Sequence, residues 1–285
     1  MDVRVTSDAI SLPDGRRLHW YEFGDSDGSP VLYTAGTPVS GLGGAAYDQQ
    51  ARAAGLRWIS PDKPGYGGSD YHRNRTLTGW AGDLAALADH LGLDRFALAG
   101  ESGGGPFTLA AAHRLADRVT VAALIATGGP ITRAEMAGQK ARIRMLYLLA
   151  TSVPALNWIP ISAMRRTLTD PARRQRDLRR DLATQPAAAH AAVRIEYEAV
   201  ADALRPGSRA TVQELALTKR PWPFPLREVT TPVHLWHGEA DRHAPIAFAR
   251  RLAGELPNAI LHVSESSGHD VGHDHAKEIM SVLGG

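Results

Sequence analysis

The chain has 285 residues, of which 44% are hydrophobic and 22% charged, and its formal net charge is +2. This length suits one globular domain with room for an inserted subdomain, and so small a charge excess argues against a nucleic-acid partner. Cysteine is absent, which excludes disulfides, thiolate catalysis and cysteine-bound zinc. Residues 1–10 carry Asp2, Arg4 and Asp8 in place of an apolar signal-peptide core, so we expect a cytoplasmic protein.

Strands and helices alternate along the first 130 residues. Apolar runs predict strands at 18–23, 31–35, 56–60, 96–99 and 119–126. Between them, Thr78 is placed to cap a helix that ends at Gly92, and a second helix covers 104–116. The alternation predicts a parallel sheet with helices on both faces, and functional sites in such sheets form at the carboxyl ends of the strands.

The composition changes after Gly128-Gly129-Pro130. Residues 131–227 are rich in Ala, Arg and Leu and predict helices without intervening strands. Strand and helix patterns then return, with strands at 232–237 and 260–263 and helices at 245–256 and 272–283. We therefore divide the chain into a first core part (1–130), a helical cap (131–227) and a second core part (228–285).

One uncharged stretch, 145–164, has the length of a membrane span. Pro154, Asn157 and Pro160 interrupt it and favour a buried or pocket-lining segment. We expect no stable membrane insertion, with a lipase carrying an interfacial cap as the alternative.

Gly100-Glu101-Ser102-Gly103-Gly104 matches the pattern G-x-S-x-G between a predicted strand and a predicted helix. A sharp turn there would expose the hydroxyl of Ser102 at the edge of the sheet, which makes Ser102 the candidate nucleophile. The alternative is a glycine-rich turn that holds a phosphate. The Lys-Ser/Thr ending of a P-loop is missing, which favours the nucleophile.

A serine nucleophile needs a base, and the base needs an acid that orients it; on this type of sheet the chain order is Ser, then Asp or Glu, then His. Asp241 follows the strand at 232–237, with Glu239 as the competing acid and a helix-capping role as the alternative. His269 follows the strand at 260–263 and is the candidate base. A metal site is the other interpretation, because His269 and His273 are four residues apart in a cluster of His and Asp.

Further motifs resemble the α/β-hydrolase-fold superfamily, in particular its serine hydrolases with a helical cap. Segment 33–38 (Tyr-Thr-Ala-Gly-Thr-Pro) resembles the His-Gly-x-Pro oxyanion loop, and 61–69 (Pro-Asp-Lys-Pro-Gly-Tyr-Gly-Gly-Ser) resembles the Asp-Arg-Pro-Gly-Tyr-Gly-x-Ser turn. Segment 222–226 resembles the return from a cap, and Gly268-His269 the usual context of the histidine.

The resemblance implies that the backbone N–H groups of Thr37 and Gly103 form an oxyanion hole. Ala35 departs from the pattern, because the family often has His at this position, and the loop is expected to depend on other supports. Ser102 separates the chain from haloalkane dehalogenases and epoxide hydrolases, which use Asp as the nucleophile.

The sequence thus predicts a serine hydrolase that cleaves a carboxylic ester or related acyl substrate through an acyl-enzyme, with no cofactor and no metal. The expected partner is a small, apolar acyl substrate, and the oligomeric state is not predictable. Pocket candidates are Leu146, Leu149, Trp158 and Trp222, with simple packing inside the cap as the alternative. Other open functions are carbon–carbon bond hydrolysis, perhydrolysis or acyl transfer with the same triad, and a non-catalytic ligand receptor.

Overall fold

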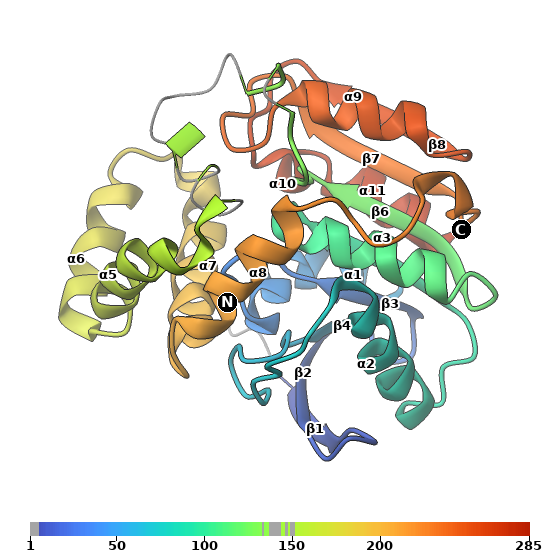
Figure 1. The fold of residues 1–285 in the computed structure, drawn as a ribbon, viewed down its shortest axis with the longest axis horizontal. Helices are drawn as coiled ribbons and strands as arrows, with labels where there is room; N and C mark the ends of the chain where they lie inside the picture. The colour runs from blue at the N-terminus through green and yellow to red at the C-terminus, as the bar shows by residue number, and fades with distance from the viewer. Residues whose placement is uncertain (1–5, 133, 137–143, 146–147, 149–151) are drawn as a thin grey trace.

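A computed structural model describes residues 6–132, 134–136, 144–145, 148 and 152–285 (Figure 1). An eight-stranded sheet forms its centre, in the order β1-β2-β4-β3-β5-β6-β7-β8. The strands are β1 (Thr6–Ser11), β2 (Arg17–Gly24), β3 (Ser29–Thr34), β4 (Leu56–Pro61), β5 (Phe96–Glu101), β6 (Val119–Ile125), β7 (Val233–Gly238) and β8 (Ala259–Ser264). β2 pairs antiparallel with β1 and β4, and all other neighbouring pairs are parallel, which confirms the predicted mostly parallel sheet.

Helices cover both faces of the sheet, because inner-strand residues alternate between two apolar cores. On β5, Phe96 and Leu98 face one core while Ala97 and Ala99 face the other. The first core packs against α2 (Leu77–His90), α3 (Gly105–Arg114) and α9 (Ile246–Glu255). The second packs against α1 (Asp48–Ala53), α11 (Ala276–Gly284) and the 3₁₀ helix Gly41–Tyr47.

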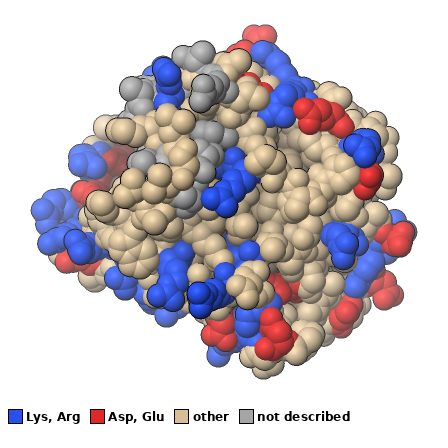
Figure 2. Space-filling view, viewed as in Figure 1, with Lys and Arg blue, Asp and Glu red and all other residues tan. Residues whose placement is uncertain are grey.

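Between β6 and β7 the described residues form helices and connecting loops but no strand, and we call this part of the chain the insert. Its helices are α5 (Trp158–Leu168), α6 (Pro171–Leu182), α7 (His190–Leu204) and α8 (Arg209–Lys219). Figure 1 shows α5 and α6 at one side of the molecule and α8 between them and the core. The arginines of α6 are largely exposed, and Figure 2 shows Lys and Arg gathered on that side. Within the described part of the chain, no helix is long and apolar enough to cross a membrane.

Two helix predictions need correction. The hydroxyl of Thr76, not Thr78, caps α2 by accepting a hydrogen bond from the N–H of Gly79 at 2.9 Å. The helix predicted at 272–283 is divided into α10 (Val271–Asp274) and α11, because His275 between them leaves the helical conformation, with φ −111° and ψ 18°. Strand β1 was not predicted, since its side chains are mostly polar and exposed.

Candidate active site

Ser102 lies in the sharp turn between β5 and α3, at the carboxyl edge of the sheet. Its φ is +49°, a left-handed conformation that is rare for a residue with a side chain. Space is tight around it: a Cβ on Gly104 would lie 2.1 Å from the carbonyl oxygen of Thr34. The end of β3 and the start of α3 can therefore approach this closely only because Gly104 has no side chain. Ser102 thus lies in the turn at the carboxyl edge of the sheet, where the sequence predicted it.

Ser102, His269 and Asp241 come together from three strand ends. His269 Nε2 lies 3.1 Å from Ser102 Oγ, and His269 Nδ1 lies 2.8 Å from Asp241 Oδ2. With Asp241 ionised, Nδ1 carries the ring proton and donates a hydrogen bond to the carboxylate, which leaves Nε2 as an acceptor for the serine hydroxyl. The side chain of Asp241 is fully buried, whereas that of His269 is 28% exposed.

The loop after β7 holds Asp241 from the other side. Asp241 Oδ1 accepts hydrogen bonds from the N–H groups of His243 (2.7 Å) and Ala244 (3.0 Å). These bonds lie in the loop before α9, whose N-cap is Pro245 without a side-chain cap, so Asp241 does not cap that helix and instead contacts His269. The competing acid Glu239 instead pairs with Arg250 at 2.7 Å.

Hydrogen bonds and charge set the protonation states of this pair. Burial by itself would raise the pKa of Asp241, but the hydrogen bond and charge of His269, with the N–H groups of Ala244 and His243, lower it below its usual value. Burial would lower the pKa of His269, but Asp241 outweighs it and, with the charges of Glu101 and Glu196, raises this pKa. The ring of His243 also stacks on His269, with centroids 4.8 Å apart.

The predicted oxyanion loop lies directly beside the serine. A Cβ on Gly36 would meet Ser102 Cβ at 3.4 Å, and a Cβ on Gly103 would meet Thr37 Oγ1 at 2.1 Å and Thr37 N at 3.4 Å. The structure thus brings Thr37 and Gly103 together next to Ser102. Their role as oxyanion donors stays a prediction.

Glu101, the residue before the serine, is fixed by two tyrosines. Its Oε2 accepts hydrogen bonds from the hydroxyls of Tyr33 (2.5 Å) and Tyr47 (3.3 Å). Burial, and then the charge of Glu101, raise the pKa of both phenols well above the ordinary value. Both tyrosines therefore remain donors, and Glu101 adds negative charge near His269.

The histidines around His269 do not converge on one point. His273 stacks on Tyr47 with centroids 5.2 Å apart, and His275 contacts Glu278 at 3.2 Å. Asp274 accepts a hydrogen bond from Ser267. Among the described residues, no group of three or more His, Asp or Glu side chains is arranged to hold a metal ion.

The pocket candidates are only partly described. Leu146 and Leu149 lie outside the described residues. Trp158, at the start of α5, is 48% exposed. Trp222 stacks on Phe224 and lies against Gly129, where a Cβ would be 2.8 Å from its ring. The pocket assignment therefore stays a prediction.

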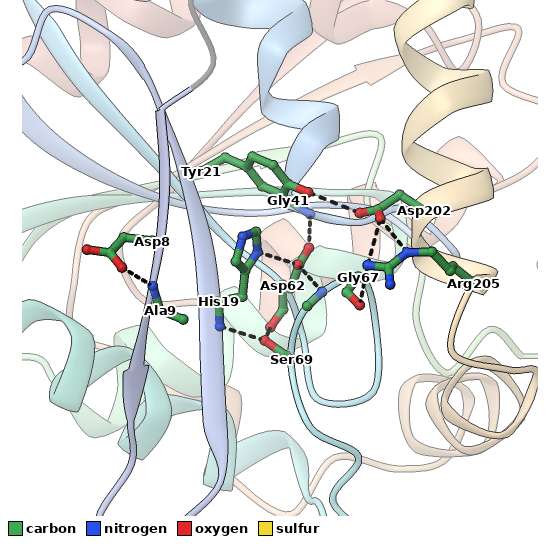
Figure 3. Close-up of polar contacts among 11 residues, drawn as sticks. Asp8, Ala9, His19, Tyr21, Gly41, Asp62, Gly67, Ser69, Asp202 and Arg205 are labelled. Atoms are coloured by element: carbon green, nitrogen blue, oxygen red, sulfur yellow. Dashed lines mark hydrogen bonds and ion pairs between the residues drawn. The ribbon is translucent and has the colours of Figure 1, made fainter.

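A buried charged group beside the oxyanion loop was not predicted from the sequence; it is formed by Lys63, Arg75 and Glu214. Lys63 follows Asp62 in the turn after β4, and Figure 3 shows Asp62 held by His19 and the N–H of Gly41. The only signal for Glu214 was its position on one helical face with Thr211 and Thr218, a face that proves fully buried.

Three comparisons place the chain among known proteins. Residues 31–282 match the model of the alpha/beta hydrolase family. The chain is 28% identical, over 99% of its length and 93% of the relative's, to a 2-hydroxy-6-oxononadienedioate/2-hydroxy-6-oxononatrienedioate hydrolase from Burkholderia vietnamiensis. A shorter match, 36% identical over 120 residues, covers 40% of this chain and 31% of the dihydrolipoyllysine-residue acetyltransferase component of an acetoin cleaving system from Pseudomonas putida.

Among solved structures, an esterase from Exiguobacterium antarcticum matches with a TM-score of 0.70 and 20% identity, over 98% of each chain. At this identity the likeness shows the fold alone. The family match extends over most of the chain, from β3 to α11. The chain therefore belongs to the alpha/beta hydrolase family and is a hydrolase.

Proposed function

We propose that the protein is a serine hydrolase that cleaves a carboxylic ester or related acyl substrate through Ser102, His269 and Asp241. The observation that carries this proposal is the unbroken hydrogen-bond chain from Asp241 through His269 to Ser102. It joins a nucleophile, a base and a group that orients the base, and each of these is needed to activate a serine hydroxyl near neutral pH.

In the first step, Ser102 Oγ attacks the substrate carbonyl carbon while His269 Nε2 takes the serine proton. The resulting imidazolium is stabilised by the ionised Asp241, whose lowered pKa keeps it unprotonated. His269 then donates that proton to the leaving alcohol as the carbon–oxygen bond breaks. Water, deprotonated by the same nitrogen, attacks the acyl-enzyme and releases the acid and free Ser102.

The N–H groups of Thr37 and Gly103 would stabilise the oxyanion in both steps. Loss of one such donor typically costs roughly 3 kcal/mol of transition-state stabilisation. The adjacency of Thr37, Gly103 and Ser102 supports this assignment. None of these steps needs a cofactor. A small, apolar acyl substrate, a cap at 131–227 and a cytoplasmic location stay predictions.

The direct test is hydrolysis of p-nitrophenyl esters of increasing acyl length by the wild type and Ser102→Ala. Ser266→Ala is the matched control, because Ser266 is an exposed serine in the loop before His269. We expect release of p-nitrophenol by the wild type and the control, and a loss on the order of 10⁵-fold or more in Ser102→Ala. Equal rates in all three proteins would contradict the proposal.

Carbon–carbon bond hydrolysis is a second candidate, favoured by the relative whose named substrate is a 6-oxo dienedioate. A ketone offers no ester bond, so water must cleave a carbon–carbon bond beside the carbonyl. Lys219 on α8 suits the carboxylate of such a substrate, since a Cβ on Gly128 would lie 3.0 Å from Lys219 Nζ and the N–H of Gly128 donates to the carbonyl of Ser102.

Product analysis separates the two candidates. The protein is incubated with a 2-hydroxy-6-oxo dienedioate and with neutral esters, and the products are identified by mass spectrometry. Carbon–carbon cleavage predicts two acids from the dioate and a KM for it that rises in Lys219→Met, with the KM for neutral esters unchanged. An unaltered dioate beside hydrolysed esters would remove this candidate.

A further inference from the structure

Lys63 lies next to the oxyanion loop and is almost completely buried, with 1% of its side chain exposed. Its ammonium group donates to the carbonyl oxygens of Ala35 (2.8 Å) and Gly36 (2.9 Å) and to Glu214 Oε1 (2.6 Å). All three of its protons are therefore used, and two of them hold the backbone of the loop that precedes Thr37.

Glu214 reaches the same place from α8 of the insert and is fully buried. Its Oε1 accepts hydrogen bonds from both Lys63 and the hydroxyl of Thr37, and its Oε2 accepts one from Arg75 at 2.5 Å. Arg75 in turn donates to the carbonyl oxygen of Pro64. One carboxylate thus joins the insert, the turn after β4 and the oxyanion loop.

Contact with the Gly36 carbonyl matters because this oxygen and the N–H of Thr37 belong to one planar peptide group. In a trans peptide the C=O and N–H bonds point in opposite directions. Fixing the oxygen towards Lys63 therefore fixes the N–H away from Lys63. A cation on the oxygen also polarises the amide and makes its N–H a stronger donor.

Several hydrogen bonds hold the turn that carries Lys63. Asp62 accepts hydrogen bonds from the N–H groups of Gly41 (2.7 Å) and Gly68 (2.8 Å) and contacts His19 at 2.8 Å (Figure 3). Arg205, which follows α7, donates to the carbonyl oxygen of Gly67 in the same turn. The insert therefore contacts this turn at a second point besides Glu214. The hydrogen bonds of Asp62 hold the backbone next to Lys63, whose ammonium group contacts the loop.

We propose that Lys63 and Glu214 are positioning residues for the oxyanion hole: Lys63 orients the Gly36–Thr37 peptide, and Glu214 supplies from α8 the counter-charge that keeps Lys63 in place. This proposal rests on the proposed function. It assigns α8 a part in building the site, and it accounts for the support of a loop that has Ala35 where related loops often have His.

The first experiment measures ester hydrolysis by Lys63→Met, which keeps the length of the side chain and removes the ammonium. We expect kcat/KM to fall on the order of 10²-fold, as for loss of one oxyanion donor, with the inhibition constant of the product acid changed less than about threefold. Glu22→Gln is the control, because it breaks the Glu22–Arg57 ion pair, which lies on β2 and β4 and does not contact the loop. This variant should keep wild-type kcat/KM.

A tetrahedral inhibitor distinguishes positioning from general loss of structure. An aryl trifluoromethyl ketone forms a hemiketal when the serine oxygen adds to its carbonyl, and the resulting oxyanion occupies the oxyanion hole. We expect Lys63→Met and Glu214→Gln to weaken this inhibitor in proportion to their loss of kcat/KM, while product binding stays unchanged. Undiminished inhibitor binding in a folded variant would overturn the proposal.

The pH dependence supplies a second readout. Burial lowers the pKa of Lys63 to about 8, although Glu214 and Asp62 oppose this and Arg75 adds to it. In Glu214→Gln the main counter-charge is lost, so the pKa of Lys63 should fall further. We expect kcat to decline at a lower pH on the alkaline side in this variant than in the wild type. Lys219, whose pKa is also about 8, is present in both proteins and cannot cause the difference.

Circular dichroism and thermal unfolding of each variant show whether it is folded at the assay temperature. If Lys63→Met proves unfolded, Glu214→Gln carries the test, because its amide keeps one oxygen acceptor for Thr37 and Lys63. Folded variants with wild-type kcat/KM would overturn the positioning roles while Ser102→Ala remained inactive. Full activity of Ser102→Ala would instead overturn the proposed function itself.

Discussion

His269 controls how the proposed chemistry depends on pH. The imidazole must be neutral to accept the proton of Ser102, and Asp241 is the main group that raises its pKa above the ordinary value. We therefore expect kcat/KM to fall on the acidic side with an apparent pKa above about 6.5. A pH–rate profile of ester hydrolysis checks this, and an acid limb well below that value would contradict the assigned geometry.

Substitutions at Asp241 and Glu239 are expected to affect activity very differently, although the two residues are only two positions apart. Asp241→Asn removes the carboxylate that orients His269, so we expect kcat to fall on the order of 10⁴-fold with KM little changed. Glu239→Gln breaks only the pair with Arg250 and should keep nearly full activity. Steady-state kinetics on one ester compares the two variants, and a greater loss in Glu239→Gln would exchange their roles.

The residues that carry the candidate chemistry could be predicted because each stands in a local pattern. Ser102 has its glycines and strand–helix context, and Asp241 and His269 follow predicted strands in a known order. Lys63 stands in the motif at 61–69, but nothing local indicates its partner, because Lys63 and Glu214 lie 151 residues apart and meet only in the folded chain. Pairings of this kind depend on how the insert packs, which periodicity does not encode.

The turn between β5 and α3 depends on close backbone approach. Gly104→Ala would place a methyl group 2.1 Å from the carbonyl oxygen of Thr34, so we expect a loss of several kcal/mol in the free energy of unfolding. Gly82→Ala is the matched control, because no atom lies within 4 Å of its added Cβ and it occupies an exposed position in α2.

Urea unfolding measures both glycine variants. For Gly82→Ala we expect a gain of roughly 1 kcal/mol, the difference between alanine and glycine inside a helix. Equal effects of the two substitutions would show that the turn is less constrained than the structure indicates.

The inner strands were predictable because both faces are buried, which gives short, continuous apolar runs. Strand β1 escaped prediction since it lies at the edge and pairs with β2 alone, so its exposed polar side chains carry no such run. The cap of α2 was misplaced by two residues because Thr76 and Thr78 both precede an apolar face. In the structure, Thr76 precedes the helix with an extended backbone and accepts the hydrogen bond from Gly79, whereas Thr78 lies inside the first turn.

At the scale of the whole molecule, the buried Lys63 and the partly buried Lys219 link stability to pH. Burial lowers the pKa of Lys63 and Lys219 to about 8 in the folded protein, against an ordinary value near 10.5 in the unfolded chain. Between these values the unfolded chain binds more protons, so the free energy of unfolding rises with pH. Buried tyrosines, whose pKa values are raised above 10.0, reverse this trend only at higher pH.

We therefore expect the free energy of unfolding to increase between about pH 8 and about pH 9.5. Urea unfolding across this range measures it. Lys219→Met should show a smaller increase, while Lys277→Met, which changes an exposed lysine of α11, should follow the wild type. A steady fall in stability across the same range would contradict the burial of charged Lys63 and Lys219.

The overall architecture could be predicted from the sequence because alternating strand and helix patterns define a parallel sheet and its carboxyl edge. The insert was less predictable: its composition indicates helices, but not that α8 buries Glu214 beside the oxyanion loop. That contact forms because the buried carboxylate of Glu214 pairs with Lys63 and Arg75, and these three residues meet only when the insert packs against the core.

Covalent labelling of Ser102 tests the central claim most directly. The purified protein is treated with a fluorophosphonate, whose phosphorus is attacked by an activated serine with loss of fluoride, and the modified peptide is located by mass spectrometry. We predict a single adduct on Ser102, absent in Ser102→Ala and strongly slowed in Asp241→Asn. A folded wild-type protein that stays unlabelled by small and large probes, or is labelled elsewhere, would contradict Ser102 as the nucleophile.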